Sequence, residues 1–338
     1  MPTLETQQLD EVIASSRRRM LTIGGAALAG LALSSLAEAQ SATLADADYL
    51  NFALNLEYLE ANFYTLAAAG VTIDQMGIGL TGTGTQGTVT VKSGGPSACK
   101  VPFTNTLVQS YATEIAKEER NHVSFLRGAL GSSAVAQPAI DLVNSFNGLA
   151  TLLGLGLTSF DPFASDINFL LGSYIFEDVG VTAYTGAAPL LTSAANLDAA
   201  AGIQAVEAYH AGLVRTVIYG LDQSATTLGA AGTARAVATA ISKLRATVDG
   251  SNSISSSRMQ GDDIGLGTQT VEMNGVSGAI ASTLVNATTT GSINAAGSTG
   301  TAGSMVSARS ATEVLAIVYA GGSGKGGFFP AGLNGNVK

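Results

Sequence analysis

The chain has little of what several classes of protein need. It contains no tryptophan, one cysteine and two histidines, and only 12% of its 338 residues are charged. A single cysteine excludes an intrachain disulfide and a zinc site built from cysteines. The formal net charge is −9, and no run of Lys and Arg occurs outside the extreme N-terminus. The chain thus lacks the basic patch of a nucleic-acid-binding protein, and we expect no DNA or RNA partner.

Apolar residues, in contrast, are abundant. They make up 46% of the chain, which is enough to bury one large core or two modest ones and too many for general disorder. The 41 glycines and seven prolines fit a chain in which helices alternate with long loops of small residues. We therefore expect a folded globular protein.

The N-terminus resembles an export signal. Ser16 and the three arginines at 17–19 precede an apolar run from Leu21 to Leu36, and small residues at Ala37 and Ala39 flank a cleavage point. Paired arginines after a serine resemble the twin-arginine variant. The apolar run is roughly 16 residues, short for a span of ~20, which favours a cleaved peptide over an anchor. We expect residues 1–39 to be removed and the mature protein to be periplasmic or extracellular.

Helical spacing of apolar residues recurs along the mature chain. It predicts four long helices, at 46–69, 104–130, 161–184 and 197–221, and shorter ones at 138–146, 233–248 and 311–319. No segment after the signal is long and apolar enough to cross a bilayer.

Two segments interrupt this helical pattern. Residues 70–102 are rich in Gly and Thr and predict a long loop with room for a small hairpin around Val89-Thr90-Val91. Residues 250–303 are mostly Ser, Gly, Thr and Asn, and should be irregular or wrapped on the surface. The predicted organisation is a signal peptide (1–39), a helical bundle (44–225) and a C-terminal extension (226–338).

Both histidines follow a glutamate at the same offset. The pairs are Glu119-Arg-Asn-His122 and Glu207-Ala-Tyr-His210, each inside a predicted helix. Residues three apart lie on one face of a helix, so each pair directs a carboxylate and an imidazole to one place, as metal ligands require. A histidine standing alone is more often a hydrogen-bonded core residue, but the repetition of the motif favours ligands.

Two further glutamates lie within apolar helical runs. They are Glu57, in the first long helix, and Glu177, in the third. An ionised carboxylate is costly to bury unpaired, so such a residue turns to solvent, takes a proton or binds a cation. Di-iron and di-manganese bundles take one Glu from each of two helices and a Glu-x-x-His from each of the other two. The order in this chain is Glu, Glu-x-x-His, Glu, Glu-x-x-His.

With these motifs the chain resembles the ferritin-like superfamily, and within it the exported ferritin-like-domain proteins often called desiccation-associated. The resemblance covers about residues 44–225 and the Gly-Gly-Phe-Phe-Pro stretch near the C-terminus. It implies an all-α, ferritin-like four-helix bundle with long irregular loops and a C-terminal extension rich in small residues. It also implies a ligand set of six residues: Glu57, Glu119, His122, Glu177, Glu207 and His210.

The resemblance favours Glu57 over Glu60, because the family's first-helix ligand stands seven residues before a tyrosine, here Tyr64. Three acids neighbour the ligands and are expected on a solvated helix face or beside a ligand. They are Glu114, Glu118 and Asp178. Four tyrosines are expected in the core rather than as radical sites. They are Tyr58, Tyr111, Tyr174 and Tyr209.

The implied cofactors are two transition-metal ions, Fe or Mn, and the implied partners are O2 or peroxide. The corresponding activity is oxidation of Fe2+ or breakdown of peroxide in stress protection, as a ferroxidase, peroxidase or catalase-like enzyme. Two other classes remain open: a non-catalytic structural stress protein, and a surface or matrix interaction protein suggested by residues 250–303. The insertion at 70–102 leaves the oligomeric state open, and a storage cage is not assumed.

Overall fold

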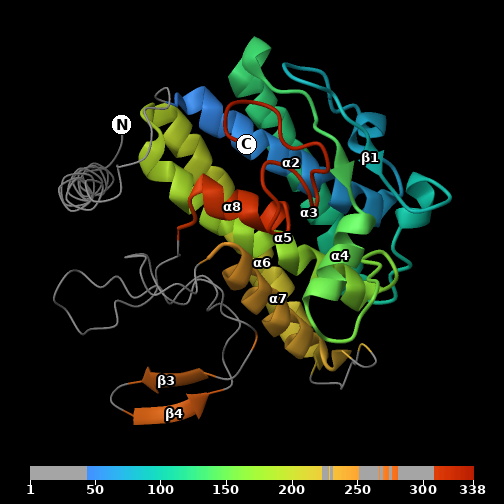
Figure 1. Cartoon of the computed structure of the whole chain (residues 1–338). Coiled ribbons are helices and arrows are strands. Elements are labelled where there is room, and N and C mark those ends of the chain that lie inside the picture. The colour runs from blue at the N-terminus through green and yellow to red at the C-terminus, as the bar shows by residue number, and fades with distance from the viewer. Residues whose placement is uncertain are drawn as a thin grey trace, which may run out of the picture. The chain divides into compact units, whose positions relative to one another are not determined.

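A computed structural model describes residues 44–222, 228, 231–250, 266, 269–273, 276–280 and 308–338. The chain divides into two units, residues 1–43 and 44–338, and the predicted signal peptide lies outside the described residues. Four long helices dominate the second unit (Figure 1). They are α2 (Asp46–Ala69), α3 (Thr106–Leu130), α5 (Asp166–Ala187) and α6 (Ala194–Asp222). The predicted all-α bundle is confirmed.

Local sequence explains where these helices begin and end. The Asn105 side chain accepts hydrogen bonds from the backbone N–H groups of Leu107 and Val108, which caps the start of α3. Helix α2 is capped at its C-terminal end by Gly70, whose φ of 71° is left-handed and suits glycine. Most of α2 and α5 is buried on every side, as their nearly continuous apolar sequences predict.

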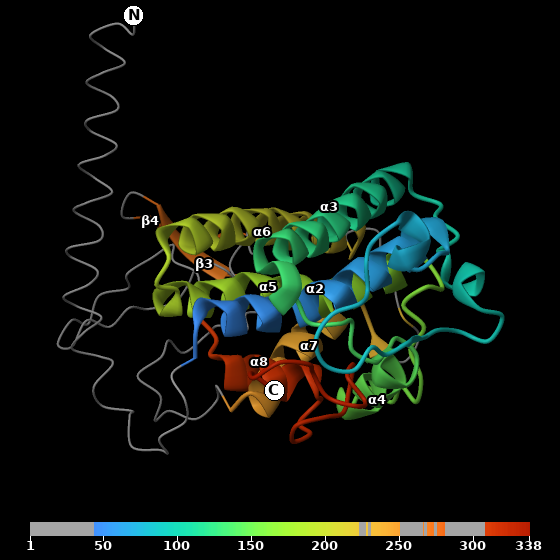
Figure 2. The same cartoon turned by 90° about the horizontal axis from the view of Figure 1, so that it is seen from above.

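The helices pair in the chain order expected for a bundle. Helix α2 packs along α3, and α5 packs along α6. Figure 2 shows α3 and α6 on one side of α2 and α5, with α7 (Ala234–Val248) and α8 (Ala311–Val318) on the other. Both α7 and α8 contact α5, so α5 is covered on both sides. Within the described ranges, no helix combines the length and the apolar character needed to span a membrane.

The predicted start of the third long helix at Asp161 was wrong. Helix α5 begins at Asp166, and the side chain of Ser165 caps it by accepting a hydrogen bond from the N–H of Asn168. The Asp161 carboxylate caps the preceding turn instead and pairs with Lys92 at 2.5 Å. Both residues are good caps, and in the structure each caps a different turn.

The segment 138–146 and the hairpin around Val89 were also predicted incorrectly. Strand β1 (Val89–Thr90) pairs in parallel with β2 (Ile140–Asp141), so the loop after α2 is joined to the segment after α3. Helix α4 (Asn144–Leu152) begins only after this strand. The Asp141 carboxylate accepts hydrogen bonds from the N–H groups of Val143 and Asn144, which fixes the start of α4.

The C-terminal extension contains more regular structure than its composition suggests. Strands β3 (Gln269–Met273) and β4 (Val276–Ile280) form an antiparallel pair, where an irregular segment was expected. Helix α8 is capped by Ser310, and Phe328 lies buried against Phe146 and Phe176 of the bundle. Asn334 binds both the 80s loop and Asn55 of α2 through hydrogen bonds. The two phenylalanines of the Gly-Gly-Phe-Phe-Pro stretch are therefore part of the core, while its proline is exposed.

Gly186 of α5 allows the chain before α8 to lie against the bundle. A Cβ atom at this position would stand 1.8 Å from the carbonyl oxygen of Arg309, which is backbone and cannot rotate away. We expect Gly186→Ala to lower the free energy of unfolding by about 1–3 kcal/mol, as overpacking usually does. Gly202→Ala on α6 is the control, because nothing lies near its Cβ position and Ala favours a helix by up to about 1 kcal/mol. Urea denaturation of both variants tests this, and equal stabilities would refute it.

Candidate metal centre

The six residues predicted as ligands come together in the interior of the bundle. Glu57 lies on α2, Glu177 on α5, and the two Glu-x-x-His pairs on α3 and α6. Each of the six side chains is buried, and none of the residues exposes more than 7% of its surface. Carboxylates and imidazoles at this depth need charge compensation from one another or from a cation.

Three carboxylates converge on one nitrogen of His122. Its Nδ1 atom lies 3.2 Å from Glu57 Oε2, 3.3 Å from Glu119 Oε2 and 3.6 Å from Glu207 Oε1. We call these four residues the His122 group. One ligand atom from each of them lies within 4.8 Å of the others, as ligands of a single ion do.

A second cluster surrounds His210. Its Nδ1 atom lies 3.0 Å from Glu119 Oε1 and 3.3 Å from Glu177 Oε2. We call Glu119, Glu177 and His210 the His210 group. Glu119 belongs to both groups and turns one oxygen toward each imidazole, while the ring centres lie 6.4 Å apart. A carboxylate placed in this way suits a bridge between two ions.

Six candidate donor atoms of the cluster are left without hydrogen bonds. Both oxygens of Glu119 and of Glu207, Oε2 of Glu177 and Nδ1 of His210 are buried and have no hydrogen-bond partner. Buried polar atoms are nearly always satisfied, so several orphans in one place call for a ligand. Oxygen and imidazole nitrogen are the donors that Fe and Mn accept. The residues therefore fit a pair of transition-metal ions.

The pKa values of these side chains are shifted by burial and by the charges of their neighbours. Burial raises the pKa of Glu57 to about 7 against the opposing effect of His122. Burial disfavours charge on His122, yet the nearby carboxylates Glu57 and Glu119 raise its pKa to about 12. The pKa of Glu207 is raised well above its usual range by burial and by repulsion from Glu119. The carboxylates thus need positive charge among them, from protonated imidazoles or from metal ions.

Two tyrosines form hydrogen bonds across the bundle with Glu57 and Glu177, the two glutamates outside the Glu-x-x-His pairs. The Tyr184 hydroxyl of α5 donates a hydrogen bond to Glu57 of α2, and the Tyr64 hydroxyl of α2 donates one to Glu177 of α5. Each tyrosine stands seven residues after the glutamate of its own helix. Tyr64 therefore supports Glu177 rather than Glu57, and sequence reasoning overlooked the matching role of Tyr184. The repeated seven-residue spacing in the third helix was the signal that could have revealed it.

Gly180 and Glu118 are further residues that shape the centre. A Cβ atom on Gly180 would stand 2.1 Å from Glu207 Oε2, so the glycine makes room for that carboxylate between α5 and α6. Glu118, whose side chain is about one-third exposed, accepts a hydrogen bond from Nε2 of His210 at 2.7 Å. A carboxylate in this position orients a ligand imidazole. Glu118 therefore lies beside His210, one of the predicted ligands.

The other neighbours are divided between surface and core. Glu60 is buried near both groups but belongs to neither. Asp178, expected on a solvated face or beside a ligand, is buried and pairs with Arg215 and Arg245. The four tyrosines were predicted to lie in the core, and Tyr58 and Tyr174 do. The prediction was wrong for the other two, which lie on the surface of α3 and α6. Tyr111 is only partly buried, and Tyr209 is 44% exposed. Tyr209 points outward because its neighbour His210 points inward, and it donates a hydrogen bond to Glu114.

Comparison with known proteins agrees with this architecture. Residues 45–220 match the family described as ferritin-like domain. The chain is 34% identical over 181 residues to the desiccation-related protein PCC13-62 of Craterostigma plantagineum, covering 52% of this chain and 53% of that protein. It is 27% identical over 178 residues to the ferritin-like catalase Nec2 of Nesocodon mauritianus, covering 52% and 54%. No solved structure matches the chain significantly.

The match to this family covers just over half of the 338 residues, and the chain therefore belongs to the ferritin-like domain family. This confirms the resemblance predicted from the Glu-x-x-His motifs, including the similarity to a desiccation-related protein. The chain spans about half the length of the curated relatives it matches. All six residues of the predicted ligand set fall within the matched region.

Proposed function

We propose that the protein binds two ions of Fe or Mn and consumes peroxide. The observation that carries this is the position of Glu119, which faces both imidazoles and belongs to both ligand groups. When bound, two such ions supply two-electron chemistry for the breakdown of peroxide or the oxidation of Fe2+. Peroxide is favoured because a similar protein is named a ferritin-like catalase.

The protein's own residues would fix the geometry of the centre. Glu57, Glu119, His122 and Glu207 would hold one ion, and Glu119, Glu177 and His210 the other. The two tyrosine hydroxyls keep Glu57 and Glu177 oriented, and burial excludes bulk water from the carboxylates. Four carboxylates offset the charge of two divalent ions, so the loaded centre is electrically balanced.

Metal analysis combined with a peroxide assay tests the proposal. We expect the mature protein, purified from its native host, to carry about two transition-metal ions per chain. It should release O2 from peroxide, and a strong chelator should abolish both the activity and part of the thermal stability. Reloading with Fe and with Mn in parallel identifies the active metal. Protein that holds no metal after reconstitution would refute the centre.

A structural role in stress protection is the second candidate. The relative named desiccation-related is the more similar of the two, at 34% against 27% identity. In that case the ions would only stabilise the bundle. The experiment above distinguishes the two functions. A purely structural centre would bind metal and raise the melting temperature, but it would leave peroxide unchanged.

Export by the twin-arginine route is part of the same proposal. That route carries folded proteins, which would permit metal loading before export. We expect Arg17→Lys combined with Arg18→Lys to retain the protein in the cytoplasm, whereas Arg19→Lys should leave export unchanged. Fractionation of cells that express each variant measures the distribution. Normal export of the double variant would exclude the twin-arginine assignment.

A further inference from the structure

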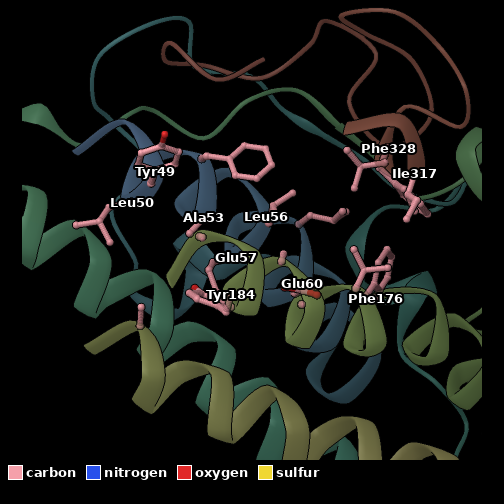
Figure 3. Close-up of a pocket in the computed structure, with 18 of the residues that line it drawn as sticks. Tyr49, Leu50, Ala53, Leu56, Glu57, Glu60, Phe176, Tyr184, Ile317 and Phe328 are labelled. Atoms are coloured by element: carbon pink, nitrogen blue, oxygen red, sulfur yellow. The ribbon is translucent and has the colours of Figure 1, made fainter. Parts of the chain in front are cut away.

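An apolar pocket lies between α2 and α5 and reaches the candidate metal centre. Its walls come from one face of α2, one face of α5, helix α8 and Phe328, and Glu57 and Glu60 also line it (Figure 3). It leaves about 50 Å³ for the centres of water-sized molecules and is partly open to solvent. Its walls are mostly apolar with a few polar groups, which is the lining of a site for an organic ligand, whereas peroxide has no apolar surface to place against them.

Glu60 is the unusual residue of this pocket. Its side chain is buried, with 6% of the residue exposed, and no hydrogen bond to its carboxyl occurs among the described residues. The neighbouring Glu57 is already engaged by Tyr184 and His122. Figure 3 shows Glu60 between Glu57 and Phe176, on the α2 wall. A buried carboxyl without a partner in an otherwise apolar pocket is a ready hydrogen-bonding group for a ligand.

The chemistry of the walls limits what can bind. Leu56, Ile317 and Phe328 offer only hydrocarbon surface, which disfavours hydrated ions and charged molecules because their water is not replaced. An anion would in addition lie against two carboxyl groups, Glu57 and Glu60, which offer it no positive charge. An ammonium ion could meet a carboxylate but would leave its other N–H groups unpaired against apolar walls. An uncharged molecule with one polar end avoids each of these costs.

We infer that this pocket binds a small uncharged organic molecule, with its apolar body against α5 and α8 and its hydroxyl or carbonyl group at Glu60. Binding itself requires no metal and goes beyond the proposed function. The polar end would lie beside Glu57, at the edge of the His122 group.

Calorimetric titration with three probes of equal chain length tests the inference. The probes are n-octanol, octanoate and octylammonium, added to the mature protein as purified. We expect n-octanol to bind with a negative heat-capacity change and the two charged probes to bind at least ~10-fold more weakly. Tighter binding of either charged probe, or no binding of n-octanol, would overturn the inference.

Substitutions then locate the probe. Ala53→Phe and Ala183→Phe fill the pocket from α2 and α5, and we expect each to abolish n-octanol binding. Ala68→Phe, also partly buried on α2 but outside the pocket, is the matched control and should bind normally. Glu60→Leu should weaken n-octanol binding by about 2–10-fold through loss of one hydrogen bond. Unchanged binding in both pocket-filling variants would place the probe elsewhere and refute the site.

Metal content measured on the same samples keeps this result separate from the proposed function. Binding of n-octanol without metal would support the pocket and contradict the proposed metal centre. Binding of two metal ions without n-octanol would support the metal centre and contradict the inferred pocket.

Discussion

Replacing Glu119 with glutamine should remove both metal ions, whereas replacing Glu177 should weaken only one. Glu119 turns one oxygen toward His122 and the other toward His210, but Glu177 lies in the His210 group alone. A glutamine keeps the shape and offers only one acceptor oxygen, which cannot serve two ions. We expect affinity to fall by more than the roughly 10–100-fold typical of losing a residue that merely supports a ligand.

Metal content and peroxide turnover of the two variants measure this difference. Glu114→Gln is the control, because it lies on the same helix, at the surface, and contacts only Tyr209 among the described hydrogen bonds. Glu177→Gln should retain about one ion per chain, and Glu119→Gln close to none. If Glu119→Gln keeps two ions, the two groups do not share a bridging carboxylate, and each would be an independent site.

The second large effect, a loss of stability, is expected on replacing Asp178, which lies next to Glu177 in α5 but pairs with two arginines. Its Oδ2 atom accepts hydrogen bonds from Arg215 of α6 and Arg245 of α7, each at 2.7 Å. Both guanidinium groups also stand over the Tyr174 ring, at 5.1 and 5.0 Å from its centre. The three charged side chains are almost fully buried. Asp178 therefore joins α5, α6 and α7 through one carboxylate.

We expect Asp178→Ala to lower the free energy of unfolding by about 3–5 kcal/mol, because two buried guanidinium groups lose the carboxylate that they share. For a domain of this size that corresponds to a fall in melting temperature of roughly 6–20 °C. Asp198→Ala, an exposed aspartate on α6, should change stability by less than about 0.5 kcal/mol. Thermal unfolding of both chelator-treated variants measures the effect without metal. Equal melting of the two would show that the arginines are compensated without Asp178.

These two predictions separate the chemistry of the centre from the stability of the bundle. Glu177 and Asp178 are adjacent in α5, yet they face different partners because successive residues of a helix point about 100° apart. Glu177 faces His210, and Asp178 faces Arg215 and Arg245. A change at one position should therefore alter metal content, and a change at the other should alter the docking of α7.

The sequence by itself determined the bundle and the composition of its candidate centre. The period of a helix is local, so apolar spacing located α2 and α6 to within a few residues. The offset of three in Glu119/His122 and in Glu207/His210 placed each pair on one helical face without knowledge of any neighbour. Glu57 and Glu177 could be singled out because a carboxylate within an apolar helix demands a partner.

Only the tertiary structure decided which partner each of these groups has. Glu119 faces both imidazoles because α3 and α6 lie side by side, and Tyr64 reaches Glu177 because α2 lies beside α5. The pairing of β1 with β2 likewise depended on contacts between residues far apart in the chain. Spacing along one helix fixes direction, but the packing of several helices fixes distance. Ligand bridging and buried ion pairs depend on that distance, which no single segment of the sequence encodes.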